Sequence, residues 1–238
     1  WKVRDDAFIK FLGRHGRLTA GYGSPNRTGL ELEFGTIMAE RFDEPVLLIK
    51  TAWGGRSIDR DFRPPSSGLP SKEALEAELA KAIDRTNREN NERDRSEALP
   101  TLEEIRGTYG KDYRAMLSEV RATLEGLDRI FPELAGHRPL LTGLVWFQGW
   151  NDQYGGAEDR YEGHLRNLIA DVRRDLDVPK LPIVIGAMGQ NGSKPSKGAM
   201  LTIATAQLAM NDAPAFTGNV RTIRTDVLID KAAEALYP

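Results

Sequence analysis

The sequence contains no cysteine and only three histidines among its 238 residues. The absence of cysteine excludes disulfide bonds, thiolate metal sites and cysteine nucleophiles, and it leaves the cellular compartment undetermined. The three histidines (His15, His137 and His164) are not clustered in the sequence, which argues against a histidine-rich metal site. We therefore expect neither a bound metal nor a cofactor.

A strong charge of one sign and a long apolar run are also absent. The formal net charge is -2, so the sequence predicts no basic surface for nucleic acid and none for an anionic membrane. No apolar stretch approaches the roughly 18 residues that a membrane span requires. A 40% hydrophobic content over this length is ordinary for a globular protein with a sizeable core. We expect one domain over residues 1–238, with no nucleic-acid partner and no membrane partner.

Apolar runs typical of strands alternate with amphipathic patterns typical of helices. This alternation predicts an α/β fold, a three-layer α/β/α sandwich around a parallel sheet. Thr28 and Glu31 have the spacing of a capping box that would open the first helix. A charged helical insertion is expected at about 66–110. The predicted strands are 45–52, 140–147, 182–187 and 219–225, and the predicted helices are 28–42, 71–88, 111–131, 158–176 and 199–210.

Two of the predicted strands end in unusual sequences, AWGGRS (52–57) and FQGWND (147–152). Ligands of open α/β sheets bind beyond the carboxyl ends of the strands. Paired glycines after a strand allow a sharp turn and leave a backbone N–H exposed, and an asparagine adds a side-chain donor. A backbone N–H and an Asn amide directed at one point form an oxyanion hole. The alternative is that both segments are ordinary turns between a strand and a loop.

The two segments resemble the SGNH hydrolase superfamily, in particular its carbohydrate-esterase branch of sialate O-acetylesterase-like proteins. GWND (149–152) resembles the block whose asparagine donates to the oxyanion, which implies that role for Asn151. Gly55 resembles the glycine whose N–H is a second donor, and WFQG (146–149) resembles a run of the acetylesterase branch. The resemblance implies a flavodoxin-like fold, serine acyl transfer, a small-molecule or polysaccharide ester substrate, and secretion or a periplasmic location.

The nucleophile and the general base of that superfamily have no counterpart here. No serine follows a strand in a Gly-Asp-Ser or Gly-Gln-Ser block, and no histidine occurs after His164. The chain also begins at Trp1 without a methionine and stops at Pro238. We therefore expect a segment that lacks the first strand and the histidine loop and is inactive alone. In the family sheet, the missing strand lies between 45–52 and 140–147, so a break is predicted there.

The remaining serine and histidine candidates have simpler explanations. Ser57 lies in a segment that imitates Gly-x-Ser-x-Gly, but the final glycine is missing, and we interpret it as a loop hydroxyl bonded to its own backbone. His164 borders the apolar face of its helix and is predicted to be structural. His137 precedes a strand at its amino end, and His15 is predicted to lie in an exposed turn.

Trp53, Trp150 and Gln148 are the predicted substrate-binding residues, because a sugar offers C–H faces to an indole and hydroxyls to an amide. Arg63, in the DFRPP loop, is a further candidate for an acidic or acetylated sugar. The alternatives are core packing for Trp53 and a loop salt bridge for Arg63. Two rival functions also remain. One is a sugar-binding protein without activity. The other is a phosphate or nucleotide binder that uses Trp53, Gly54 and Gly55; it ranks last, because the sequence contains neither a Gly-x-Gly-x-x-Gly motif nor the P-loop lysine pattern.

Overall fold

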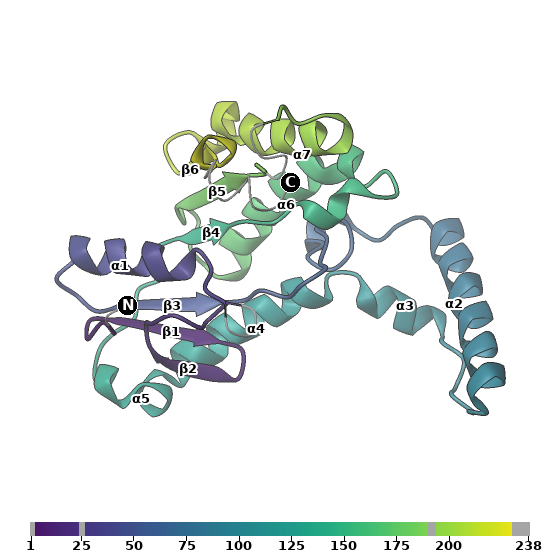
Figure 1. Cartoon of the computed structure of the whole chain (residues 1–238), viewed down its shortest axis with the longest axis horizontal. Helices are drawn as coiled ribbons and strands as arrows, with labels where there is room; N and C mark the ends of the chain where they lie inside the picture. The colour runs from purple at the N-terminus through teal and green to yellow at the C-terminus, as the bar shows by residue number, and fades with distance from the viewer. Residues whose placement is uncertain (1–2, 24–26, 190–193, 230–238) are drawn as a thin grey trace. The chain divides into compact units, whose positions relative to one another are not determined.

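The computed structural model describes residues 3–23, 27–189 and 194–229, and its helices and strands are labelled in Figure 1. The chain forms two compact units. Unit 1 contains Trp1–Gly54 and Ala115–Leu140, and unit 2 contains Gly55–Arg114 and Leu141–Pro238. Both chain ends lie outside the described residues, and the single domain over residues 1–238 remains a prediction.

Unit 1 contains a three-stranded sheet in the order β2-β1-β3. β1 (Ala7–Phe11) pairs with β2 (Arg14–Arg17) in the antiparallel sense and with β3 (Val46–Lys50) in the parallel sense. The sequence analysis missed both β1, an apolar run that reads AFIKF, and β2, which reads RHGR and carries no apolar alternation. The prediction for His15 was therefore wrong in part: it is exposed, but it lies in β2 with its ring edge against Phe131.

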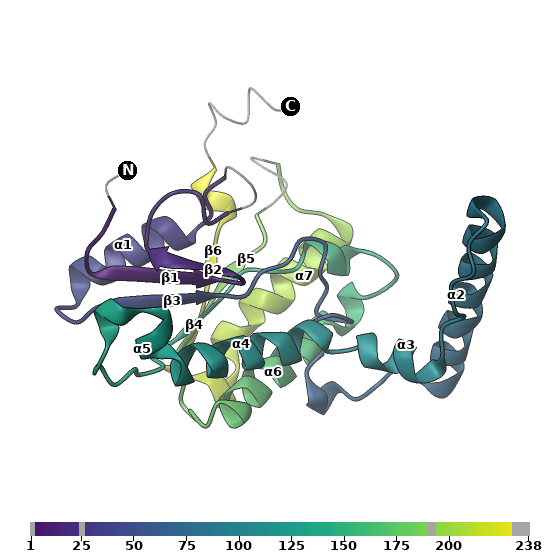
Figure 2. The same ribbon diagram turned by 90° about the horizontal axis from the view of Figure 1, so that it is seen from below.

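Helices cover both faces of this sheet, because successive residues of β1 point to opposite sides. Ala7 and Ile9 pack against α1 (Glu31–Arg41), in a core that includes Leu32. Phe8 packs against Phe131 and the short helix α5 (Leu127–Ile130) on the other face. Figure 2 shows α1 and α5 on opposite sides of the strands of unit 1. Unit 1 is thus a three-layer α/β/α arrangement.

The predicted capping box of α1 does not form. The Thr28 hydroxyl accepts a hydrogen bond from the Gly21 N–H at 3.4 Å, outside the helix. The Glu31 carboxylate is buried and pairs with Lys50 at 2.9 Å, so it is engaged with β3. Glu31 therefore forms an ion pair with Lys50, and the spacing of Thr28 and Glu31 in the sequence does not reveal this pair.

The buried side of α1 includes Leu32, Gly35 and Ala39. A Cβ atom at Gly35 would lie 2.4 Å from Leu18 Cδ2, so the helix approaches the sheet at a glycine. Leu30, Ile37 and Phe42 are each about half exposed, and β3 is half-buried throughout. The helix predicted over 28–42 is thus observed as α1.

Unit 2 contains a parallel sheet in the order β4-β5-β6, formed by β4 (Leu144–Trp146), β5 (Ile183–Ala187) and β6 (Val220–Arg224). Trp146 Nε1 lies 3.4 Å from the Tyr161 hydroxyl on α6 (Glu158–Asp175). On the same face, the Thr222 hydroxyl donates to the Gln207 carbonyl on α7 (Gly198–Leu208) at 2.6 Å. One face of the sheet therefore packs on α6 and α7, and the predicted α/β class with a parallel sheet is confirmed.

β3 and β4 belong to different sheets, so the described strands form two three-stranded sheets and not one. This agrees with the predicted break between residues 45–52 and 140–147. The observed β4 has three residues, shorter than the predicted strand. The predicted helix 111–131 is interrupted at Gly126, between α4 (Lys111–Glu125) and α5.

Two helices of unit 2 lie within the predicted charged segment. α2 (Lys72–Arg93) begins at Ser71, whose hydroxyl accepts from the Ala74 N–H at 3.2 Å, and α3 (Leu102–Thr108) begins at a complete Thr101–Glu104 capping box. Figures 1 and 2 show α2 standing away from the β4–β6 sheet of its unit. The described 3₁₀ helices are Pro65–Ser67, Pro132–Leu134, Trp150–Gln153, Ala209–Asp212, Pro214–Phe216 and Asp226–Leu228.

Candidate functional site

Gly55 and Asn151 are neighbours in unit 2, as predicted. A Cβ atom built on Gly55 would lie 3.5 Å from Asn151 Nδ2. Gly55 has φ +73, a conformation that glycine adopts without strain. Asn151 lies in the 3₁₀ helix Trp150–Gln153, a few residues beyond the carboxyl end of β4. The structure thus brings together the two predicted donors, while their role toward an oxyanion remains a prediction.

The Asp152 carboxylate joins the two loops that carry this pair. Its side chain is fully buried, and it accepts hydrogen bonds from the backbone N–H groups of Ile58 at 3.0 Å and Asp59 at 2.9 Å. Burial raises the pKa of Asp152 above its ordinary value, and the hydrogen bonds from Gln148, Ile58 and Asp59 oppose that rise. The sequence analysis gave Asp152 no role of its own, although it directly follows the predicted donor.

Gln148 makes hydrogen bonds through both its side-chain amide and its backbone carbonyl. Its Nε2 donates to Asp152 Oδ2 at 2.6 Å and to the Arg56 carbonyl at 2.9 Å. Its own carbonyl accepts from the Tyr161 hydroxyl and from Gln207 Nε2, both at 2.8 Å. The two N–H groups of the amide therefore have partners within unit 2, and its role in binding substrate stays a prediction.

Aromatic side chains lie on the surface of the Asn151 loop. Trp150 is 51% exposed and Tyr154 is 65% exposed. The predicted contact of Trp150 with a sugar ring stays a prediction. Trp53 belongs to unit 1, where it is half-buried. Its predicted role in substrate binding is untested by this arrangement.

Arg63 lies in a cluster of charges centred on Asp59. The Arg63 guanidinium is largely buried and donates to the carbonyls of Gly68 at 2.6 Å and Asp59 at 2.7 Å. Arg160 makes two hydrogen bonds to the Asp59 carboxylate, at 2.8 and 2.9 Å. These contacts support the alternative of a loop salt bridge for Arg63, and its contact with substrate remains a prediction.

The pKa of Asp59 reflects the same cluster. Burial acts to raise it, but hydrogen bonds from Arg160 and His164 and the nearby positive charges outweigh burial and hold it well below its ordinary range. Asp59 is therefore ionised at neutral pH. Its carboxylate neutralises guanidinium groups that would otherwise face one another.

The structure also brings together a serine, a histidine and an aspartate that the sequence analysis did not connect. His164 Nδ1 lies 2.8 Å from the Ser67 hydroxyl, and His164 Nε2 lies 3.0 Å from Asp59 Oδ1. Arg63 Nη1 lies 3.2 Å from the same Nε2. A general base at His164 would become a third cation between Arg63 and Arg160, facing a single carboxylate. We therefore interpret this buried histidine as structural, in agreement with the sequence prediction.

Ser57 is engaged within its own loop. Its hydroxyl lies 3.3 Å from Asp61 Oδ2 and accepts from the Arg60 N–H at 3.1 Å. The Ser57 N–H donates to the same Asp61 oxygen at 2.9 Å. These bonds confirm the prediction of a loop hydroxyl that satisfies nearby backbone.

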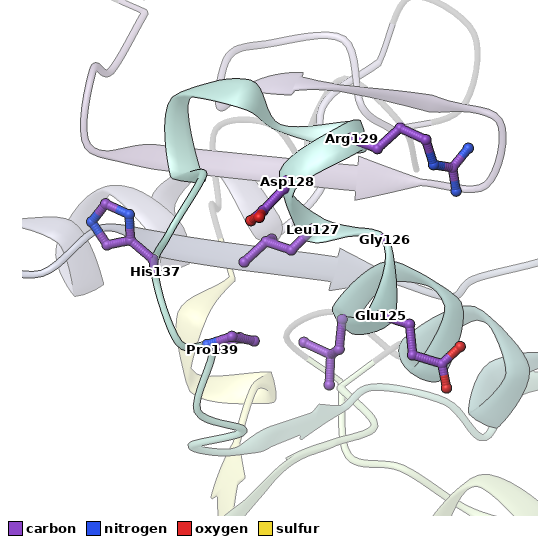
Figure 3. Close-up of a pocket in the computed structure, with 8 residues that line it drawn as sticks. Glu125, Gly126, Leu127, Asp128, Arg129, His137 and Pro139 are labelled. Atoms are coloured by element: carbon purple, nitrogen blue, oxygen red, sulfur yellow. The ribbon is translucent and has the colours of Figure 1, made fainter.

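A pocket of about 350 Å³ lies in unit 1 and is shown in Figure 3. Its His137 ring approaches the Leu134 carbonyl at 3.2 Å. The pocket contains none of the predicted site residues. It is lined by Leu124, Glu125, Gly126, Leu127, Asp128, Arg129, His137 and Pro139.

Residues 3–23, 27–189 and 194–229 contain no group of three histidine, aspartate or glutamate side chains that could hold a metal ion. In the same residues, no helix has the length and apolar character needed to cross a bilayer.

Two solved structures are similar to this chain at low sequence identity. A protein from Arabidopsis thaliana has a similar fold, with a TM-score of 0.56 and 16% identity over 98% of this chain and 73% of that chain. A carbohydrate acetylesterase from Xanthomonas citri gives a TM-score of 0.47 and 16% identity over 92% of this chain and 42% of that chain. The search of curated proteins gives no match.

The family comparison covers most of the chain, including both strand ends with Gly55 and Asn151. A family model described as "Carbohydrate esterase, sialic acid-specific acetylesterase" matches residues 17–233. The chain therefore belongs to the carbohydrate esterase family of sialic acid-specific acetylesterases.

Proposed function

We propose that this chain forms the ester-binding part of a carbohydrate O-acetylesterase, in which the Gly55 N–H and Asn151 Nδ2 donate to the oxyanion. The observation that supports the proposal best is the 3.5 Å approach between a Cβ position on Gly55 and Asn151 Nδ2. Membership of the esterase family makes an ester the substrate class to test first. A sugar would lie against the exposed Trp150, with Trp53, Gln148 and Arg63 as further candidate contacts.

In the proposed reaction, a serine hydroxyl attacks the acetyl carbonyl while a histidine takes its proton. The carbonyl oxygen becomes an oxyanion and accepts hydrogen bonds from Gly55 and Asn151. The C–O bond to the sugar then breaks, the sugar oxygen takes the proton, and water later releases acetate from the serine. Each oxyanion donor typically stabilises the transition state by about 3 to 4 kcal/mol. We assign the serine and the histidine to sequence outside residues 1–238.

A sugar-binding protein without activity is the second candidate. Two observations favour it. The Ser57 hydroxyl bonds to Asp61, and the Ser67 hydroxyl bonds to a buried histidine that lies between two arginines, so we interpret neither serine as a nucleophile. In that function, the exposed Trp150 and Tyr154 would bind sugar, and Asn151 would bond to a ground-state carbonyl or hydroxyl.

An acetate-release assay separates the two candidates. We expect residues 1–238 to release no acetate above background from an aryl acetate or an O-acetylated sialic acid, because an activated hydroxyl is missing. A chain extended by its flanking coding sequence should release acetate, and Ser57→Ala and Ser67→Ala should leave its rate unchanged.

Two results would contradict this proposal. If residues 1–238 hydrolyse the ester and either serine variant abolishes the activity, the nucleophile lies within these residues. If the extended chain is inert but binds the sugar in calorimetry, the protein is a sugar binder.

A further inference from the structure

We infer that Asp152 is a positioning residue, which holds the loop of Gly55 against Asn151 and so fixes the spacing of the two oxyanion donors. This inference rests on the proposed function. Asp152 directly follows Asn151, and its two partners, Ile58 and Asp59, lie three and four residues after Gly55. One carboxylate therefore connects two segments that are more than 90 residues apart in the sequence.

The contact uses both oxygens of the carboxylate. Oδ2 accepts from the Ile58 N–H at 3.0 Å, and Oδ1 accepts from the Asp59 N–H at 2.9 Å. Two parallel bonds to consecutive N–H groups restrict rotation as well as distance. A shift of the 55–59 loop would break these bonds, and a shift of Asp152 would carry Asn151 with it.

Gln148 adds a second connection on the other side of Gly55. Its Nε2 donates to Asp152 Oδ2 at 2.6 Å and to the Arg56 carbonyl at 2.9 Å. Arg56 is the next residue after Gly55, so the hydrogen bond to the Arg56 carbonyl restrains the backbone directly beside the glycine. We call the side chains of Asp152 and Gln148, with the backbone of residues 56, 58 and 59, the loop clip.

The loop clip is anchored in the core of unit 2. The Gln148 carbonyl accepts from Tyr161 on α6 and from Gln207 on α7, and both of these side chains are fully buried. The Asn151 loop is therefore the fixed partner, and the Gly55 loop is held against it. Preorganised donors of this kind cost no reorganisation when charge develops on the substrate.

The chemistry of the clip requires a carboxylate at residue 152. All three of its partners are donors: two backbone N–H groups and an amide NH₂. An asparagine here would present its own NH₂ to Asp59 in one orientation, and to Ile58 and Gln148 in the other. Either orientation leaves at least one buried donor without an acceptor, at a cost that only local movement relieves.

Hydrogen exchange in residues 1–238 tests the clip itself, without any need for activity. Asp152→Asn should accelerate exchange of the Ile58 and Asp59 amides at least tenfold. Gln153→Ala is the control, because it removes a neighbouring side-chain amide that donates to the Trp150 carbonyl and not to the loop clip. This variant should leave the exchange rates of the Ile58 and Asp59 amides unchanged. Unchanged exchange in a folded Asp152→Asn chain would overturn the inference.

Kinetics of the extended, active chain test the connection to the donors. Asp152→Asn should lower kcat about tenfold with little change in KM, since a small misplacement of catalytic groups has effects of this order or larger. In an Asn151→Ala background, the same substitution should have a much smaller effect, because the donor that it positions is gone. A merely structural residue would lower activity equally in both backgrounds, and that result would overturn the inference.

Gln148→Met provides the second variant if Asp152→Asn does not fold. It keeps the length of the side chain and both backbone bonds of Asp152, and we expect kcat to fall about threefold with KM unchanged, again only when Asn151 is present. A rise in KM alone would assign Gln148 to the substrate and overturn its place in the clip. If no extended chain hydrolyses ester, the proposed function fails, while the exchange rates still decide whether Asp152 holds the loop.

Discussion

Replacing Asn151 by alanine should lower the turnover of an acetyl ester about a hundredfold in the extended chain, because it removes an oxyanion donor. The effect should appear in kcat and in kcat/KM alike, since the bond to the oxyanion is made chiefly in the transition state. Asn151 is half-buried in a loop that Asp152 and Gln148 hold independently, so folding should be little affected.

Gln153→Ala is the matched control for this prediction. Gln153 lies two residues away in the same 3₁₀ helix, and its amide bonds to the Trp150 carbonyl at 2.9 Å. It should retain the wild-type rate within about threefold, because it donates to the loop and not to the proposed oxyanion. An Asn151→Ala protein that folds and keeps full activity would show that this amide is not a donor in the reaction.

The sequence predicted the fold where strands are apolar and helices are long. The strands at 183–187 and 220–224 and the helix at 158–175 were found near their predicted limits. The first two strands were missed. β1 reads AFIKF, an apolar run that the sequence analysis overlooked, whereas β2 reads RHGR, has no apolar periodicity and gains its strand conformation from pairing with β1. Tertiary contact decided β2, and such contact leaves no pattern within a short window.

The candidate site could be predicted only where its residues follow strands. Gly55 and Asn151 follow strands, and the rule that sheet ligands bind at carboxyl ends was sufficient to place them together. The roles of Asp152 and Asp59 could not be deduced from local sequence. Arg63 is four residues from Asp59, but the other partners of the two carboxylates named above, Ile58 and Asp59 for Asp152 and Arg160 and His164 for Asp59, lie about 90 to 105 residues away. A single sequence shows a carboxylate, but not the backbone N–H groups or the guanidinium groups that fold against it.

Asp59→Asn should destabilise the protein by about 2 to 4 kcal/mol at neutral pH. This is somewhat less than the roughly 3 to 5 kcal/mol expected when one partner of a fully buried ion pair is removed, because the cluster is partly exposed. The substitution leaves the Arg63 guanidinium, which is 9% exposed, without its carboxylate. Loss of the Arg160–Asp59 pair contributes less to this destabilisation, because the Arg160 side chain is 49% exposed and solvent screens its charge. Urea unfolding followed by circular dichroism would measure the difference.

The pH dependence of this effect follows from the depressed pKa of Asp59. A carboxylate with a lower pKa in the folded state stabilises the protein above its unfolded pKa of about 3.9, and this contribution is lost as the pH falls toward the folded pKa. The stability difference between wild type and Asp59→Asn should therefore be largest near neutral pH and narrow below about pH 4. Glu162→Gln, which breaks the exposed pair with Arg166, should change stability little at any pH. If the Asp59→Asn difference is the same at pH 3 and pH 7, ionised Asp59 does not hold this cluster together.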